Sequence, residues 1–126
     1  MQLKARILLV DDEPVILQFL KRVLTGEGYE IETVANVSDA FKRIKKERYH
    51  LILLDIKLPG GSGIELYRRI QGIAQSLARR VVFITGDVMG TDTRNFLSRT
   101  RAPYITKPFD TEQLKEEISR LLANTA

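Results

Sequence analysis

Leu51-Ile52-Leu53-Leu54-Asp55 is a run of branched apolar residues that ends on a single carboxylate. Such a run is typical of a strand buried on both faces, as in a parallel sheet that helices cover. Two other runs end in a similar way: residues 7–10 lead into Asp11-Asp12-Glu13, and residues 81–84 lead into Thr85-Gly86-Asp87. In open α/β sheets, ligands bind outside the carboxyl ends of the strands. The sequence therefore predicts that acids and a hydroxyl meet at one edge of a sheet.

Strand and helix patterns alternate five times along the chain. Strands are predicted near residues 5–10, 31–35, 51–55, 80–84 and 102–105, each followed by a helical pattern. With right-handed crossovers, this order gives an α/β fold: a (βα)5 doubly wound, flavodoxin-like fold with a five-stranded parallel sheet in the order 2-1-3-4-5. We expect Asp12 to cap the first helix, Asn36 or Ser38 the second and Asp110 the last. The helix near residues 92–98 is predicted to be short.

The composition is that of one globular domain. The chain has 126 residues, of which 44% are hydrophobic and 29% are charged, and we expect residues 1–126 to form a single domain. The absence of cysteine excludes disulfides and thiolate metal sites, which suits the cytoplasm. No apolar run reaches the ~18 residues of a membrane span, so no membrane insertion is expected.

The net charge of +4 raises the question of nucleic acid binding. The densest basic stretch, residues 42–48, lies at the end of a predicted amphipathic helix, where cations interact favourably with the helix dipole. Aromatic residues do not interleave with these cations, as a base-stacking surface would require. We interpret the stretch as a solvated helix face, with docking to an acidic protein partner as the second interpretation. No direct nucleic acid binding is expected.

The three acids at the predicted sheet edge indicate a metal site. Asp11 and Asp12 alone could be turn and capping residues, but Asp55 comes from another strand end, and clustered carboxylates repel unless a cation neutralises them. An oxygen-only ligand set with room for water suits octahedral Mg²⁺, with Mn²⁺ as a substitute. His50, the only histidine, opens the third strand far from Asp55 and is predicted to be a structural or surface residue.

Lys107 follows the last predicted strand, within Tyr104-Ile105-Thr106-Lys107-Pro108-Phe109. The predicted sheet order places Lys107 beside the acids, so that its ammonium can pair with a carboxylate or with a phosphoryl oxygen. Thr85 could be a plain strand-end hydroxyl, but it also has the right length to donate to a phosphoryl oxygen. Pro108 is a candidate for a cis peptide bond.

Taken together, these motifs resemble the receiver domain of two-component response regulators. The resemblance covers essentially the whole chain and rests on Asp11-Asp12, Asp55 with Leu58-Pro59 and Gly63, Thr85-Gly86, and residues 104–109. Residues 83–110 also resemble the receivers that are attached to hybrid sensor histidine kinases. Such a domain acts in phosphorelay signal transduction.

The resemblance implies a role for each site residue. Asp55 would be the phosphoacceptor. Asp12, Asp55 and the backbone carbonyl of Lys57 would bind Mg²⁺ directly, and Asp11 would act through water.

Further residues would act on the phosphoryl group. By the same resemblance, Thr85 and Lys107 would contact it, and Thr85 and Tyr104 would form the switch that responds to it. Lys57 and Asp87 would project over the mouth of the site and tune the lifetime of the phosphoryl group.

The implied partner is a histidine kinase or a histidine phosphotransfer domain, whose phosphohistidine donates the phosphoryl group. The receiver would catalyse its own phosphorylation and dephosphorylation, and it is a signalling domain rather than an enzyme. A phosphorylation-dependent dimer is a further candidate interaction.

Three other functions are compatible with this fold class. A flavodoxin binds its flavin phosphate on a Ser/Thr/Gly loop after the first strand, where Asp11-Asp12-Glu13 would repel a phosphate. A phosphatase with an aspartyl nucleophile on the first strand does not match, because the acids lack the usual Asp-x-Asp spacing. A receiver-like interaction module that is never phosphorylated would not need all five site residues, and a phosphorylation assay distinguishes it.

Overall fold

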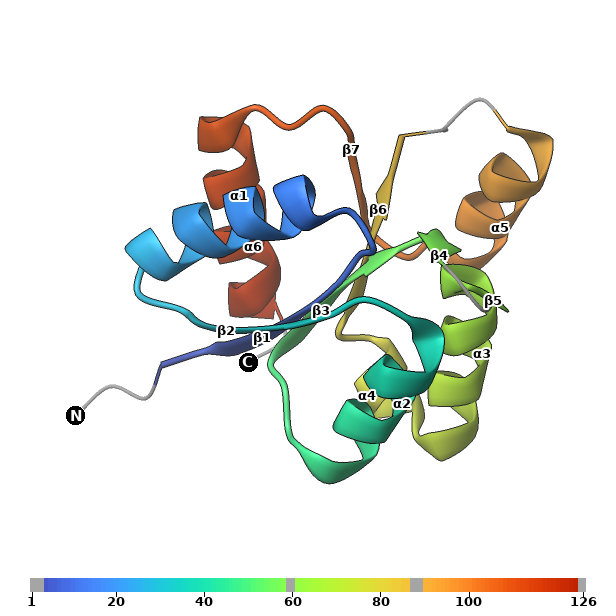
Figure 1. Cartoon of the computed structure of the whole chain (residues 1–126). Coiled ribbons are helices and arrows are strands. Elements are labelled where there is room, and N and C mark those ends of the chain that lie inside the picture. The colour runs from blue at the N-terminus through green and yellow to red at the C-terminus, as the bar shows by residue number, and fades with distance from the viewer. Residues whose placement is uncertain (1–3, 59–60, 87–89, 125–126) are drawn as a thin grey trace.

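Figure 1 shows the computed structural model of the protein, which describes residues 4–58, 61–86 and 90–124. Five parallel strands form one sheet in the order β2-β1-β3-β6-β7. They are β1 (Arg6–Val10), β2 (Glu30–Val34), β3 (Leu51–Asp55), β6 (Val81–Thr85) and β7 (Tyr104–Thr106). Because β6 and β7 are the fourth and fifth strands of this sheet along the chain, the predicted order 2-1-3-4-5 is confirmed.

Helices cover both faces of the sheet (Figure 1). One face carries α1 (Pro14–Gly26) and α6 (Thr111–Asn124); the other carries α2 (Val37–Lys46), α3 (Gly63–Ile73), α4 (Gln75–Ala78) and α5 (Thr91–Thr100). None of these described helices is both long and apolar enough to cross a membrane.

Alternate side chains of the three central strands, β1, β3 and β6, enter the two cores. In β1, Ile7 and Leu9 pack in the cluster with α1 and α6, whereas Leu8 and Val10 pack in the cluster with α2, α3 and α5. Every residue of β3 is buried, as predicted for a central parallel strand. Asp55 is therefore held at the end of the most buried part of the sheet.

The first helix starts one residue later than predicted. Glu13, not Asp12, is its N-cap residue, and Pro14 occupies the first turn. The backbone N–H of Glu13 donates to Asp11 Oδ1 at 2.9 Å, which forms a turn between the strand and the helix. This turn uses Asp11 and leaves the Asp12 side chain exposed at the sheet edge. The capping predictions for Asn36 and Asp110 are confirmed by their side-chain bonds to the helix backbone.

The helix α5 is longer than the predicted 92–98, because aromatic packing stabilises it. The Phe96 ring lies edge-on to Phe83, at 5.1 Å between centroids, and to Tyr67, at 5.7 Å. Such contacts, together with burial, outweigh the weak helix propensity of this segment. The last strand is shorter and later than the predicted 102–105, because it begins at Tyr104; before it, the Pro103 carbonyl accepts the Phe83 N–H at 2.9 Å.

Two elements were not predicted from the sequence. One is the short helix α4, and the other is a small antiparallel pair, β4 (Lys57–Leu58) with β5 (Gly61–Ser62). The antiparallel pair begins two residues after Asp55, and it leads the chain to the start of α3. It therefore forms one wall of the sheet edge where the acids were predicted to meet.

Candidate functional site

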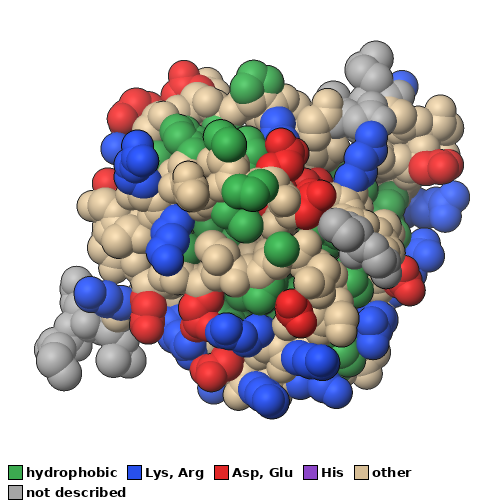
Figure 2. Space-filling model, in the orientation of Figure 1, with side chains coloured by type: hydrophobic (Ala, Val, Ile, Leu, Met, Phe, Trp, Pro, Cys, Tyr) green, Lys and Arg blue, Asp and Glu red, His purple; other side chains and the backbone are tan. Residues whose placement is uncertain are grey.

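A cleft of about 500 Å³ opens at the carboxyl ends of β1, β3 and β6. The residues that line it are Asp12, Glu13, Asp55, Lys57, Leu58, Thr85, Gly86 and Lys107. Figure 2 shows a group of acidic side chains on this part of the surface, beside the start of α1. The cleft thus collects polar residues from the ends of four different strands, β1, β3, β6 and β7.

The three predicted acids meet beside this cleft. Asp11, Asp12 and Asp55 each offer a carboxylate oxygen, and these oxygens lie within 4.8 Å of one another. Asp11 is completely buried and Asp55 is 5% exposed, whereas Asp12 is exposed to solvent. Two buried carboxylates at this spacing repel each other, so the cluster needs positive charge.

Lys107 supplies part of that charge. Its Nζ lies 3.0 Å from Asp55 Oδ2, 3.1 Å from Asp11 Oδ2 and 3.2 Å from Glu13 Oε1. Burial disfavours its ammonium form, but the interactions with Asp55 and Asp11 outweigh burial and raise the pKa of Lys107 above its ordinary value. Lys107 is therefore a permanent cation in the centre of the acids.

The backbone fixes where Lys107 lies. Its N–H donates to the carbonyl oxygen of Thr85 at 2.9 Å, which extends the pairing of β6 with β7 by one residue. The peptide bond between Lys107 and Pro108 is cis, as predicted. These contacts explain how a residue 52 positions away along the chain reaches Asp55.

The ionised form of Asp55 is disfavoured in this environment. Burial raises the pKa of Asp55, the nearby Asp11 charge raises it further, and hydrogen bonds from Lys107 and from the backbone N–H of Lys57 oppose the shift. The Lys57 N–H donates to Asp55 Oδ1 at 3.0 Å. Asp55 is thus oriented from both of its oxygens, yet it remains short of positive charge.

These residues fit a hard divalent cation. A single ammonium, that of Lys107, faces the carboxylates of Asp11, Glu13 and Asp55. The buried Asp11 Oδ2 accepts no well-aligned hydrogen bond from a described residue, although Lys107 Nζ is 3.1 Å away. All of the clustered donors are oxygens, which is the ligand type of Mg²⁺. The exposed Asp12 leaves one side of the cluster open to water.

Gly63 packs directly under the phosphoacceptor candidate. A Cβ at this position would lie 2.2 Å from the backbone oxygen of Asp55, closer than atoms can approach. The Gly63 N–H donates to the carbonyl of Ile56 at 2.7 Å. The start of α3 is therefore tied to the end of β3 through a contact that only glycine allows.

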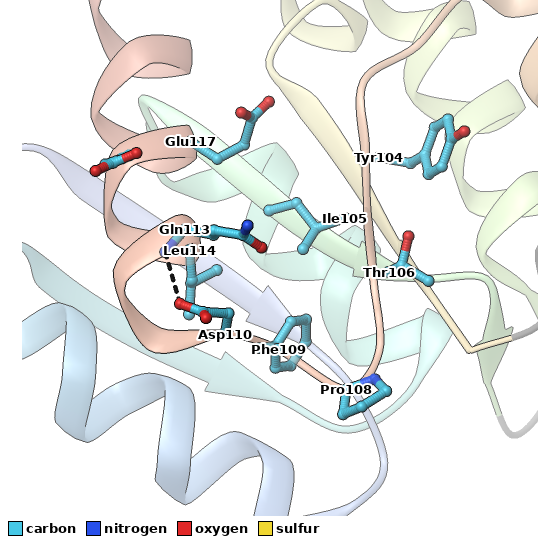
Figure 3. A pocket seen from close by; sticks show the side chains of 10 residues that line it. Tyr104, Ile105, Thr106, Pro108, Phe109, Asp110, Gln113, Leu114 and Glu117 are labelled. Carbon is cyan, nitrogen blue, oxygen red and sulfur yellow. Dashed lines mark hydrogen bonds between the residues drawn. The ribbon is translucent and has the colours of Figure 1, made fainter.

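The other predicted residues are found in different surroundings. Thr85 is 3% exposed and lines the cleft, as predicted. Tyr104 is 49% exposed and lies at the top of a separate groove along β7 and α6, shown in Figure 3. Asp87 lies outside the described residues.

His50 lies at the opposite end of the sheet from this site. Its Nδ1 accepts a hydrogen bond from the Arg6 N–H at 3.0 Å, which confirms a structural role.

Glu13 is the residue of the site to which we assigned no role from the sequence. Its carboxylate reaches Lys107 and lines the cleft, although its side chain is 58% exposed. The only signal for it was its position directly after the two aspartates. That signal is weak, because an acid at the start of a helix is common for reasons of capping alone.

Comparison with known proteins gives a consistent result. Residues 7–119 match the family model described as the response regulator receiver domain. The chain is 30% identical over 118 residues to the transcriptional regulatory protein CrdR of Helicobacter pylori, covering 94% of this chain and 55% of that protein. It therefore spans about half the length of the curated relatives that it matches.

Two solved structures with magnesium bound are similar to this chain in fold and sequence. The response regulator TrrA of Thermotoga maritima, solved in complex with Mg²⁺ and BeF, is 37% identical, with a TM-score of 0.80 and coverage of 93% of this chain and 98% of that one. The receiver domain of the sensor histidine kinase PA1611 of Pseudomonas aeruginosa, solved with a magnesium ion in its active site cleft, is 30% identical, with a TM-score of 0.84 and coverage of 96% and 99%.

Proposed function

The chain belongs to the response regulator receiver domain family, and from this premise we propose that Asp55 is the phosphoacceptor of a phosphorelay. The observation that carries the proposal is the position of Asp55. Its carboxylate lies at the edge of an open cleft, 3.0 Å from the Lys107 ammonium and close to two further acids. A carboxylate nucleophile held beside fixed positive charge is suited to taking up a phosphoryl group.

The transfer forms one bond and breaks another. A carboxylate oxygen of Asp55 attacks the phosphorus, and the bond between phosphorus and the donor's imidazole nitrogen breaks, so that the imidazole leaves. The Lys107 ammonium would then contact a phosphoryl oxygen, and the Thr85 hydroxyl would donate to another. Positioning and charge neutralisation supply most of the catalysis in such transfers.

The acid cluster would hold Mg²⁺, with Mn²⁺ as a substitute. We assign Asp12, Asp55 and the backbone carbonyl of Lys57 as direct ligands, and Asp11 as a residue that acts through water. The bound ion would neutralise charge on the phosphoryl oxygens. The magnesium in the PA1611 receiver and the Mg²⁺ complex of TrrA support this assignment.

The added charge of about −2 on Asp55 would be read by Thr85 and Tyr104. Thr85 is buried beside the cleft, whereas Tyr104 lies half exposed on the neighbouring strand, two positions from Thr106, the register partner of Thr85. A Thr85 hydroxyl that turned towards the phosphoryl group would leave space near β7 into which the Tyr104 ring can move. We assign these two residues as the switch.

The remaining assignments concern the setting of the domain. We propose that residues 1–126 act as one receiver domain in the cytoplasm, and that its donor is a phosphohistidine on a histidine kinase or a histidine phosphotransfer domain. We further predict that the domain forms a dimer on phosphorylation and that it is attached to a hybrid kinase. We also predict that Lys57 and Asp87 together tune the lifetime of the phosphoryl group.

The phosphoryl analogue formed from beryllium and fluoride tests the proposal in solution. With Mg²⁺ present, it should shift the amide resonances of Thr85 and Lys107 in the whole chain, because the analogue would sit on Asp55 between them. The Asp55→Asn variant should show no such shift.

The two metal-binding roles can be compared in the same experiment. The Asp12→Ala variant should require more Mg²⁺ for the same response than the Asp11→Ala variant, since only Asp12 would bind the ion directly.

Two results would contradict these assignments. An unchanged response in the Asp55→Asn variant would place the acceptor elsewhere. A larger loss of Mg²⁺ affinity in Asp11→Ala than in Asp12→Ala would exchange the two metal-binding roles. As a folding control, the two alanine variants should keep wild-type far-ultraviolet circular dichroism in metal-free buffer.

A further inference from the structure

The edge of the sheet at β2 carries backbone groups without a strand partner. Among the described residues, β2 pairs only with β1. Glu30 N–H donates to the carbonyl of Ala5 at 2.9 Å, and the Val34 carbonyl accepts from Asp11 N–H at 3.2 Å, so both residues turn their peptide groups towards β1. Because such groups alternate along a strand, Thr33 directs its N–H and C=O to the open edge.

A groove of about 570 Å³ runs along this edge. One side is formed by residues 33–35 at the end of β2, and the other by the charged side chains of α2 and its C-cap: Asp39, Lys42, Arg43, Lys46 and Glu47. The groove is separate from the Asp55 cleft, with which it shares no lining residue. It therefore combines an open strand edge with a charged wall.

Both acids of this wall are engaged within the molecule. The Asp39 carboxylate accepts a hydrogen bond from the Asn36 side chain at 3.0 Å, and Glu47 forms an ion pair with Arg6 at 3.1 Å. Arg43 is engaged as well, because it pairs with Glu32. Three of the five charged side chains of the wall are thus held by internal contacts, Glu47 and Arg43 by ion pairs and Asp39 by a hydrogen bond from a neutral amide.

Lys42 and Lys46 remain. Neither forms an ion pair with a residue in the described part of the chain, and both are exposed. They are four residues apart in α2 and so lie on the same face of the helix, where like charges destabilise each other. An acidic group bound in the groove would relieve this repulsion.

The spacing of these two lysines matches a strand. Four residues of a helix rise about 6 Å, and two residues of a β-strand rise about 6.6 Å. Consecutive side chains on one face of an added strand would therefore reach Lys42 and Lys46 in turn. Figure 2 shows Lys and Arg side chains gathered at the bottom of the view, where Figure 1 places α2 and α4.

We propose that this groove binds an extended acidic segment of a partner protein, which adds to β2 as a further strand and pairs alternate carboxylates with Lys42 and Lys46. Backbone hydrogen bonds to Thr33 would provide affinity, and the two lysines would select acidic side chains. A nucleic acid fits this surface less well. Phe41 of α2 is half-buried and has the Arg69 guanidinium 4.1 Å and the Lys45 ammonium 5.0 Å from its ring centroid. Tyr49, whose hydroxyl bonds to Glu32, is completely buried, so neither ring offers an open face for a base.

The test uses the whole chain, labelled with ¹⁵N, and a short synthetic peptide of alternating glutamate and valine. The peptide should shift the amide resonances of residues 33–35 and slow hydrogen exchange at Thr33. The Lys42→Glu/Lys46→Glu variant should bind it at least about tenfold more weakly, because attraction becomes repulsion. The matched control Lys21→Glu/Arg22→Glu makes the same change of charge on α1 and should keep the affinity within about twofold.

Further peptides separate strand addition from simple charge attraction. A glutamate–valine peptide that is N-methylated at alternate residues cannot pair with Thr33 and should lose binding, and the corresponding lysine–valine peptide should not bind. Equal binding of the N-methylated peptide, an equal loss in the α1 control, or resonance shifts confined to other surfaces would overturn the proposal. Tighter binding of duplex DNA than of the peptide at residues 33–46 would also overturn it.

Discussion

Replacing Gly63 with alanine should lower the free energy of unfolding by about 3 kcal/mol. This value is at the upper end of the typical cost of adding a methyl group to a well-packed interior. The added Cβ would lie 2.2 Å from the Asp55 backbone oxygen and 3.0 Å from the Ile56 Cα. These are main-chain atoms at the end of a central strand, so no side chain can turn away to make room. The chain must separate there, and Asp55 would move with it.

Gly72→Ala is the matched control for this prediction. Gly72 lies in the same helix, α3, but a Cβ built there meets no atom within 4 Å. Alanine in a helix is favoured over glycine by roughly 0.5–1 kcal/mol, so this variant should be slightly stabilised. Urea denaturation in metal-free buffer measures both variants. Similar free energies of unfolding for the two would show that the close approach at Gly63 is not a constraint.

Replacing Lys107 with methionine should destabilise the metal-free protein by about 3 kcal/mol at neutral pH, because removal of one partner leaves buried charges uncompensated. The side chains of Asp11 and Asp55 are only 1% and 8% exposed. In the variant they would stay buried without the ammonium group that pairs with both of them. Lys115→Met is the control. Lys115 is more exposed and lies 3.5 Å from Glu112, and an exposed pair contributes at most about 1 kcal/mol.

The loss in the Lys107→Met variant should depend on pH. The pKa of Asp55 is already raised by burial, and Lys107 is among the groups that lower it, so removal of Lys107 raises it further. When the pKa of a carboxyl group is higher in the folded state than in the unfolded state, the group stabilises the fold most in its protonated form, at pH values below its ordinary pKa of 3.8. This stabilisation is lost as the pH rises through the raised pKa of the folded state. The destabilisation should therefore be largest at neutral pH and shrink towards pH 4. Urea titrations across this range measure it, and a loss that is independent of pH would contradict the charge explanation.

Much of the fold was predictable because the signals were local. The run from Leu51 to Leu54 is apolar at every position, and this pattern correctly predicted a central parallel strand. The three acids and Lys107 follow strand ends, and the parallel order of the strands brings those ends together. Sequence reasoning therefore found most of the candidate site before any distance was known.

The parts that were missed depend on contacts that are distant in sequence. The length of α5 is set by Phe96, which packs against Phe83 and Tyr67 from other elements. The start of α1 is a local exception: the Asp11 side chain, only two residues away, accepts a hydrogen bond from the backbone N–H of Glu13, and Glu13 rather than Asp12 becomes the N-cap residue. The pairing of Glu13 with Lys107 joins residues 94 positions apart, and nothing in the local pattern indicates it.

The most direct test of the central claim is intact-mass spectrometry of the protein after incubation with acetyl phosphate. With Mg²⁺ present, we expect a mass increase of one phosphoryl group, which is absent when a chelator removes the metal and absent in Asp55→Asn. The Asn variant keeps the shape of the side chain and removes only the nucleophilic carboxylate, so it is the closest control. Equal labelling of Asp55→Asn and the unmodified chain would contradict the assignment of Asp55 as the phosphoacceptor.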